Sequence, residues 1–350
     1  MPAAEQFSSA DLFYGLTWPM VLGTVLAVPC AAFWPLYAGR RNSLSWWQCF
    51  PSVSCRVESF VATPLGQVHY RRRGVGKSKV LVVMLAGIGH DSSYWPEVME
   101  AVSQNHQVIA LDLFGRGATD AGRGPYDADG FAGLVRAALA SLDLAHRPLA
   151  MVGFSFGGAV AAHFAAGTAE VIGSLLIVPA GIALTPSFGA GLRFLKGLPR
   201  GLADLVGVLA SLGGLLCFGH TGRTQDTTEA GYEERASRVW RYSAQDFLCN
   251  PSFFRAYMRT LRDFPMGSED ANLQKSFKQL QRLGPRLEII LATTDTIVPA
   301  KEVHKFLVSE LPEARVVEVR GGHDVQWDRP DDTSQLILDF LGRLKLEVSK

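Results

Sequence analysis

One short stretch, MVGFSFGGAVAA at residues 151–162, most strongly constrains what this chain can fold into. An apolar run ends at Gly153, a serine follows at position 155, and small residues continue beyond it. A sharp strand-to-helix turn brings the residues two before and two after its serine close together, and glycine suits that crowding. The stretch therefore predicts a strand, a strained turn that exposes the Ser155 hydroxyl, and a helix that starts at Phe156.

An acid and a histidine follow this serine in the chain, each after an expected strand. Asp295 comes just after the apolar run at residues 287–292, and His323 follows an alternating run and two glycines. Asp324 and Asp328 are alternative acids. Asp324 adjoins His323, which makes an approach to the far ring nitrogen awkward, and Asp328 is expected to cap the next turn. The order serine, aspartate, histidine therefore favours Asp295 as the acid of a catalytic triad.

Four segments, VGFSFGG, DLFGRGATD, TTDTIVP and GGHDVQWDRP, together resemble the α/β-hydrolase superfamily in sequence and in order. The resemblance extends between residues 57 and 345. It implies an α/β-hydrolase fold, with a mainly parallel central sheet and helices on both faces, which the alternation of expected strands and helices also indicates. It also implies that Ser155, His323 and Asp295 hydrolyse an ester through an acyl-enzyme.

An oxyanion hole is expected from two backbone N–H groups. Phe156 supplies one at the helix N-terminus, and the resemblance places the other at Ile88, in the loop AGIGHDSSYW. Ala86 stands where the family usually has histidine, but a backbone donor does not depend on that side chain. His90 either partly replaces the missing histidine or is a loop residue without a role.

Within the superfamily, the chain is most similar to membrane-anchored monoacylglycerol lipases and lysophospholipases, through its apolar N-terminus and the segment IVPAGI. This similarity implies a lipid or other ester as substrate. Acyltransferases, S33-type aminopeptidases and carbon–carbon bond hydrolases share the fold and stay open as alternatives. So does a non-catalytic ligand-binding protein.

Residues 12–38 carry no charged side chain, and the run is longer than the about 20 residues that a helix needs to cross a bilayer. A single-pass membrane anchor is expected there, with a signal peptide or a buried helix as alternatives. The acidic Glu5 and Asp11 do not suit the basic start of a signal peptide. Arg40 and Arg41 follow the run and favour a cytosolic catalytic domain.

The strand–helix alternation stops between Ile182 and Leu283, which predicts a helical cap inserted after the sixth strand. Its part at residues 201–218 holds one charged residue and either dips into a membrane surface or forms a core helix of the cap. The anchor with its flanks is expected at residues 1–45. The core is expected in two parts, at residues 46–181 and 284–350, with the cap at residues 182–283 between them.

Composition argues against several other classes of protein. The net charge of +1 comes from 34 basic and 33 acidic residues, so no bulk field favours nucleic acid. The five cysteines are scattered without metal-ligand or redox spacing, and we expect them reduced, although Cys49 and Cys55 are near enough to pair in a lumenal domain. No metal and no cofactor are expected, and the oligomeric state is left open.

Two other polar positions are assigned to structure. His163 lies eight residues beyond Ser155, about two helical turns away, and is expected to be packed rather than catalytic. Asp112, with Gly115 and Gly117, is assigned to the turn after the strand at residues 107–112.

Overall fold

A computed structural model describes residues 59–74, 78–122, 124–199, 201–202, 205, 250, 253–267 and 271–348. The expected anchor at residues 12–38, the cap segment at residues 206–218 and all five cysteines lie outside the described residues. Among the described helices, none has the length and apolar character to span a membrane. The domain boundaries given above stay a prediction.

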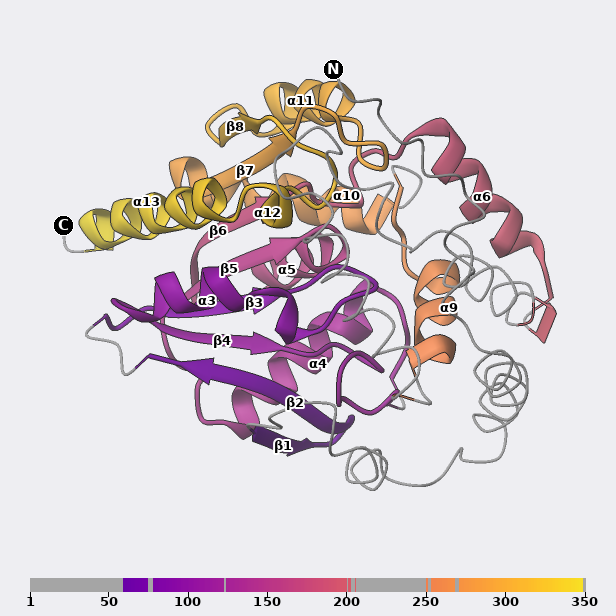
Figure 1. Ribbon diagram of the computed structural model, residues 1–350, viewed down its shortest axis with the longest axis horizontal. Coiled ribbons are helices and arrows are strands. Elements are labelled where there is room, and N and C mark those ends of the chain that lie inside the picture. The colour runs from indigo at the N-terminus through magenta and orange to yellow at the C-terminus, as the bar shows by residue number, and fades with distance from the viewer. Residues whose placement is uncertain are drawn as a thin grey trace, which may run out of the picture. The chain divides into compact units, whose positions relative to one another are not determined.

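The described residues contain an eight-stranded sheet in the order β1-β2-β4-β3-β5-β6-β7-β8 (Figure 1). The strands are β1 (Ser59–Thr63), β2 (Gly66–Arg73), β3 (Leu81–Leu85), β4 (Gln107–Leu111), β5 (Leu149–Phe154), β6 (Val171–Ile177), β7 (Leu287–Ala292) and β8 (Arg315–Val319). From β4 to β8, neighbouring strands pair parallel. The β1–β2 hairpin and the β2–β4 pair are antiparallel. The mainly parallel sheet is as predicted.

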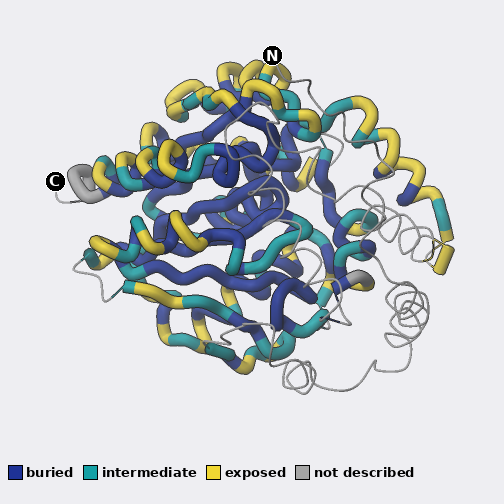
Figure 2. The backbone as a smooth tube through the Cα atoms, in the orientation of Figure 1, coloured by how far each residue is buried: buried dark blue, intermediate teal, exposed yellow. Residues whose placement is uncertain are grey.

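Helices cover both faces of this sheet because its central strands are apolar on both faces. Along β3, Leu81, Val83 and Leu85 belong to one buried cluster, and Val82 and Met84 belong to the other. The first cluster includes residues of α4 (Ala128–Ser141), α5 (Phe156–Ala166), α10 (Ala271–Gln279) and α11 (Ala300–Glu310). The second includes residues of α3 (Pro96–Ser103) and α13 (Pro330–Val348). The central strands are buried along their length, as parallel strands covered on two faces must be (Figure 2).

The chain between β6 and β7 forms several helices among its described residues. It contains α6 (Pro186–Gly197), α9 (Phe253–Asp263), α10 and the 3-10 helix η3 (Leu280–Arg286). Two shorter elements lie elsewhere, η2 (Ser92–Tyr94) and α12 (Val325–Asp328). Helix α9 packs against α6, while α10 packs against α5 of the core. The helical insertion after the sixth strand therefore rests directly on the helix that follows Ser155.

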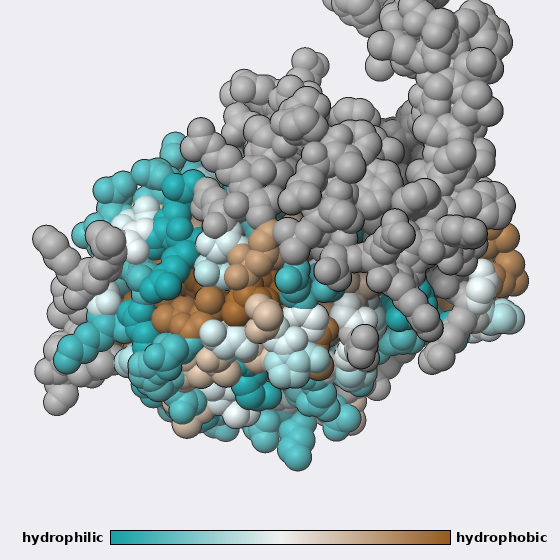
Figure 3. Space-filling view, turned by 90° about the horizontal axis from the view of Figure 1, so that it is seen from below, coloured by the Kyte–Doolittle hydropathy of each residue, from teal (hydrophilic) through white to brown (hydrophobic). Residues whose placement is uncertain are grey.

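On the face seen in Figure 3, the described residues present both hydrophilic and hydrophobic side chains. Large exposed apolar side chains include Phe194, Leu202 and Leu205, in and just after α6. The described part of the predicted cap therefore presents apolar groups to solvent.

Candidate active site

Ser155 occupies a sharp turn between β5 and α5. Its φ and ψ are 52° and −117°, a left-handed conformation that costs about 1–3 kcal/mol for a residue with a side chain. The surrounding backbone holds it there, because its N–H donates to the Ile177 carbonyl at 2.9 Å and its carbonyl accepts from Ala180 at 3.0 Å. The predicted strand, strained turn and helix start are all present.

Two glycines allow the close approach of backbone that this turn needs. A Cβ atom on Gly153 would lie 2.6 Å from the Gly157 carbonyl oxygen. One on Gly157 would lie 2.3 Å from the carbonyl oxygen of Ala86 and 2.4 Å from that of Leu85. The start of α5 therefore packs against the end of β3, and neither position has space for a side chain.

Gly157→Ala is expected to lower the free energy of unfolding by about 3 kcal/mol, because the methyl group meets backbone oxygens that cannot rotate away. Urea titration followed by circular dichroism measures this change. Gly167→Ala, at the end of the same helix, is the matched control, since a Cβ there meets nothing within 4 Å. Equal stability of the two variants would contradict the close packing at the turn.

The structure brings the three predicted side chains into one hydrogen-bonded row. Nε2 of His323 lies 2.8 Å from Oγ of Ser155, and Nδ1 lies 2.7 Å from Oδ2 of Asp295. An ionised carboxylate only accepts, so Nδ1 carries the proton and Nε2 is left to accept from the hydroxyl. Ser155 is 7% exposed, so the prediction that the turn exposes its hydroxyl was wrong and the serine is buried. His323 is 6% exposed, and the Asp295 side chain is fully buried. In this arrangement the ring can take the hydroxyl proton.

The carboxylate of Asp295 is fixed by the loop that follows β7. Its Oδ1 accepts from the N–H groups of Ile297 at 2.7 Å and Val298 at 2.9 Å. Since Oδ1 is held by the backbone, Oδ2 is turned toward the histidine ring.

The two alternative acids make other contacts. Asp324 accepts a hydrogen bond from the Tyr94 hydroxyl, and Asp328 accepts from the Gly322 N–H at 3.1 Å. Burial, together with the charge of Asp324 and its hydrogen bond, raises the pKa of Tyr94 well above its usual 10, so this hydroxyl stays a donor. Asp295 is therefore the carboxylate in contact with Nδ1.

Burial of the His323 ring disfavours its charged form and lowers its pKa, but three effects oppose this. They are the charge of Asp295, the hydrogen bond to Asp295 and the charge of Asp324. Together they raise the pKa of His323 above its usual 6.5. The site thus stabilises the imidazolium that forms when the ring accepts a proton.

The predicted oxyanion loop follows β3 directly. His90 donates its N–H to the Gly87 carbonyl at 3.2 Å, so Ile88 lies at the first corner of a turn. The N–H groups of Ile88 and Phe156 have no acceptor within the described part of the chain. His90 stacks on Tyr94, with ring centroids 4.0 Å apart, and its Nε2 lies 4.0 Å from Asp324. His90 is thus part of the Tyr94–Asp324 contact, which lies beside His323.

The other predicted positions have structural partners. The His163 ring lies 2.8 Å from Oγ of Ser276 and 2.8 Å from Oδ1 of Asp129, which links α5 to α10 and α4. Asp112 accepts from the Ser92 N–H at 2.7 Å and contacts the buried His69 at 2.7 Å, so it joins two loops and β2. Its pKa is subject to burial, which raises it, but the charge of His69 and several hydrogen bonds outweigh burial and lower it.

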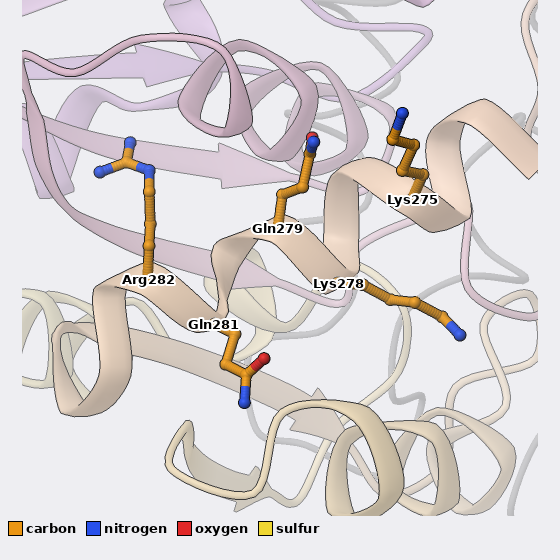
Figure 4. Close-up of a pocket in the computed structure, with 5 residues that line it drawn as sticks. All are labelled: Lys275, Lys278, Gln279, Gln281 and Arg282. Carbon is orange, nitrogen blue, oxygen red and sulfur yellow. The ribbon is translucent and has the colours of Figure 1, made fainter.

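No group of three potential metal ligands occurs in the part of the chain that the structure describes. A surface hollow of about 530 Å³ lies beside α10 and η3 and is lined by Lys275, Lys278, Gln279, Gln281 and Arg282 (Figure 4). Two of its three cations have partners within the chain: Lys278 pairs with Glu310 at 2.9 Å, and Arg282 donates to backbone carbonyls. None of the three side chains of the row lines this hollow.

Comparison with known proteins agrees with this fold and geometry. Residues 82–336 match the family described as the alpha/beta hydrolase family. The chain belongs to the α/β-hydrolase family. The matched residues contain strands β4 to β8 and the turn that holds Ser155.

Three proteins of known sequence are similar to this chain over most of its length. An uncharacterized protein of Mycobacterium tuberculosis is 30% identical over 244 residues, which are 68% of each chain. A monoacylglycerol lipase of Xenopus laevis is 24% identical over 339 residues, 93% of this chain and 95% of the lipase. A 2-hydroxy-6-oxononadienedioate/2-hydroxy-6-oxononatrienedioate hydrolase of Paraburkholderia phymatum is 27% identical over 79% of this chain and 91% of its own.

A solved structure shares the fold at low identity. The enol-lactonase of Burkholderia xenovorans LB400 superimposes with a TM-score of 0.58 and 20% identity, covering 81% of this chain and all of the lactonase. The monoacylglycerol lipase and the Paraburkholderia phymatum enzyme are hydrolases of different substrates, so they support a hydrolase and leave its substrate to be argued separately.

Proposed function

We propose that this protein is a membrane-associated serine hydrolase that cleaves carboxylic esters of lipids, such as monoacylglycerols or lysophospholipids. The observation that carries the chemistry is the row of Ser155, His323 and Asp295 at a strained strand-to-helix turn. A buried serine alone would be unreactive, because a hydroxyl needs an adjacent base to act as a nucleophile.

In the proposed reaction, Oγ of Ser155 attacks the ester carbonyl carbon while Nε2 of His323 takes the hydroxyl proton. The carbonyl π electrons move to its oxygen, and the N–H groups of Ile88 and Phe156 donate to that oxyanion. The tetrahedral intermediate collapses, and the leaving alkoxide takes the proton from Nε2. Water then attacks the acyl-enzyme with His323 as base, which releases the carboxylic acid and restores Ser155.

Three observations support a lipid substrate at a membrane. The uncharged run at residues 12–38 is long enough to anchor the chain, and the arginines that follow it favour a cytosolic catalytic domain. The monoacylglycerol lipase of Xenopus laevis aligns along 93% of this chain. The described part of the insertion after β6 exposes Phe194, Leu202 and Leu205. A substrate carried in a bilayer would meet such a surface.

The substrate proposal is tested by comparing hydrolysis of monoacylglycerols and lysophospholipids with that of short water-soluble esters, using full-length protein in detergent micelles. Faster turnover of the long-chain lipids is expected, with Ser155→Ala as the blank. Equal kcat/KM on both kinds of ester would remove the case for a lipid substrate and leave the ester chemistry intact.

A second candidate is hydrolysis of a carbon–carbon bond in 2-hydroxy-6-oxononadienedioate, a compound in the name of the Paraburkholderia phymatum relative. The same serine, histidine and aspartate suit that reaction, so the row of side chains does not separate the two. Loss of the substrate's absorbance on incubation with the protein, without turnover of any ester, would favour this second candidate.

We expect kcat/KM to rise with increasing pH, with a midpoint above pH 6.5. His323 must be neutral to accept the serine proton, and its pKa is raised by the neighbouring carboxylates despite burial of the ring. Activity is therefore lost as pH falls through that raised pKa. Initial rates on a soluble ester between pH 5 and pH 9 measure it. A midpoint below 6.5 would contradict the electrostatics of the site.

A further inference from the structure

Arg116 is a fully buried cation in the loop after β4. Its Nε donates to the carbonyl of Ile88 at 3.0 Å, and its Nη1 donates to the carbonyl of Phe114 at 2.7 Å. Its Nη2 donates to the hydroxyl of Thr260 on α9 at 2.9 Å. A guanidinium is planar and its donors diverge at fixed angles, so three bonds in three directions leave it a single orientation.

The backbone that carries Arg116 is held as firmly as its side chain. Gly115 and Gly117 flank it in left-handed conformations, with φ of 68° and 51°. The buried amide of Asn250 donates to both of their carbonyls, at 3.1 and 2.7 Å. A Cβ on Gly117 would lie 2.0 Å from a carboxylate oxygen of Asp112, so this turn requires glycine. The loop therefore presents the guanidinium from a fixed base.

The Arg116 bond reaches the peptide that follows Ile88, in the proposed oxyanion loop. The peptide that precedes Ile88 is held by a separate bond, from the His90 N–H to the Gly87 carbonyl. In a trans peptide the N–H points opposite to the carbonyl, so this second bond sets the direction of the Ile88 N–H. With both neighbouring peptides anchored, Ile88 cannot rotate without breaking one of the two bonds.

The same guanidinium also contacts the other proposed donor residue. It lies 5.5 Å from the centroid of the Phe156 ring and 5.9 Å from that of Phe131. Phe156 packs edge-on against Phe131 and against Phe264, with centroids 4.9 and 4.7 Å away. One buried cation thus touches both residues whose N–H groups are assigned to the oxyanion.

We propose that Arg116 is a positioning residue for the oxyanion hole, acting through the Ile88 carbonyl and the Phe156 ring. This inference rests on the proposed serine hydrolase function and deepens it. Arg116 touches no reacting atom. It holds the peptide that follows Ile88 and packs on the Phe156 ring, and it connects both residues to Thr260 in the helical insertion.

The test uses Arg116→Lys and Arg116→Met in the full-length protein, assayed on a short soluble ester. The N–H groups of Ile88 and Phe156 are proposed to bind the transition state and not the ground state, and Arg116→Met would leave them poorly oriented. We therefore expect kcat to fall about 100-fold in Arg116→Met, with KM within about threefold of wild type. Lysine retains the charge but lacks the planar fork, so a smaller loss of the same kind is expected. Thermal unfolding checks that each variant is folded.

A trifluoromethyl ketone that mimics the ester gives a readout that a merely structural role would not move. The serine oxygen adds to its carbonyl carbon, the proton passes to the histidine, and the resulting hemiketal oxyanion occupies the hole. In Arg116→Met, the inhibition constant should therefore increase by the same factor by which kcat/KM falls. Binding of the alcohol product, which forms no oxyanion, should stay unchanged.

Arg136→Met is the matched control, since Arg136 also lies over a phenylalanine ring, at 5.5 Å from Phe164, but is exposed and belongs to α4 rather than to the loop. It should leave kcat and inhibitor affinity unchanged. A folded Arg116→Met with wild-type kcat and inhibitor affinity would overturn the positioning role. If Arg116→Met does not fold, the same comparison is made with Arg116→Lys. If neither variant folds, Arg116 is needed for folding and the positioning role is overturned. Ester turnover that persists in Ser155→Ala would instead overturn the proposed function.

Discussion

Ser155→Ala and His323→Ala are each expected to lower kcat by about a millionfold, and the double variant is expected to be no worse than either one. The two side chains act as one unit, because Nε2 of His323 removes the proton from the serine oxygen that it contacts at 2.8 Å. Removing either one leaves the other without a function in the reaction. Initial rates on a soluble ester, with purified protein at high concentration, measure the residual activity.

The activity of the double variant shows whether Ser155 and His323 act as one unit or independently. If the two residues acted independently, their effects on the activation free energy would add, and the double variant would be slower than either single one. His163→Ala is the control for losing a histidine, since His163 contacts Ser276 and Asp129 and lies outside the row. Activity of His323→Ala close to that of His163→Ala would contradict the assigned base.

Asp295→Asn is expected to lower kcat by about 10⁴-fold while KM changes little. An asparagine can present N–H to the ring, which favours the tautomer with the proton on Nε2 and leaves no acceptor for the serine proton. The variant also loses the charge that stabilises the imidazolium and raises the pKa of His323. Steady-state kinetics across pH 5 to 9 measure both effects.

Asp324→Asn is the matched control for this carboxylate. Asparagine can still accept the hydrogen bond from Tyr94, so the contact beside the histidine is retained. A loss of less than about tenfold is expected, which corresponds to 1.4 kcal/mol in the barrier. Because the charge of Asp324 also raises the pKa of His323, the acid limb of the pH profile should move to lower pH. A larger loss in Asp324→Asn than in Asp295→Asn would exchange the roles of the two acids.

Much of the core was predictable because it is encoded locally. Strand β5 and helix α5 follow from an apolar run, two glycines and a series of small residues around Ser155. Asp295 and His323 each come directly after a strand, at β7 and β8, and parallel strands place such positions at one edge of a sheet. The order of the motifs therefore predicted which side chains would meet.

Contacts between distant loops were not predictable in this way. Arg116 was part of a segment recognised as a turn, but its partners Ile88 and Thr260 lie 28 and 144 residues away. The Tyr94–Asp324 bond spans 230 residues. No periodicity or spacing encodes such pairs. A weak signal was available for Arg116, since a long cation between two glycines in a sharp turn can be directed inward.

The helical insertion was predicted from the loss of strand–helix alternation, not from a motif of its own. The described part, with α6, α9 and α10, is helical as predicted. Its contact with the core through Thr260 was not predicted. That contact depends on the burial of one hydroxyl against Arg116, and the sequence around Thr260 has no pattern that distinguishes it.

The claim on which the account depends is that the Ser155 oxygen forms a covalent bond to the substrate. A fluorophosphonate reacts with such a serine and leaves a stable phosphonyl group, which peptide mass spectrometry locates. The account predicts one adduct, on the peptide that contains Ser155, and none after heat denaturation or in Ser155→Ala. Absence of an adduct on the folded wild-type protein, or equal labelling of Ser155→Ala, would contradict it.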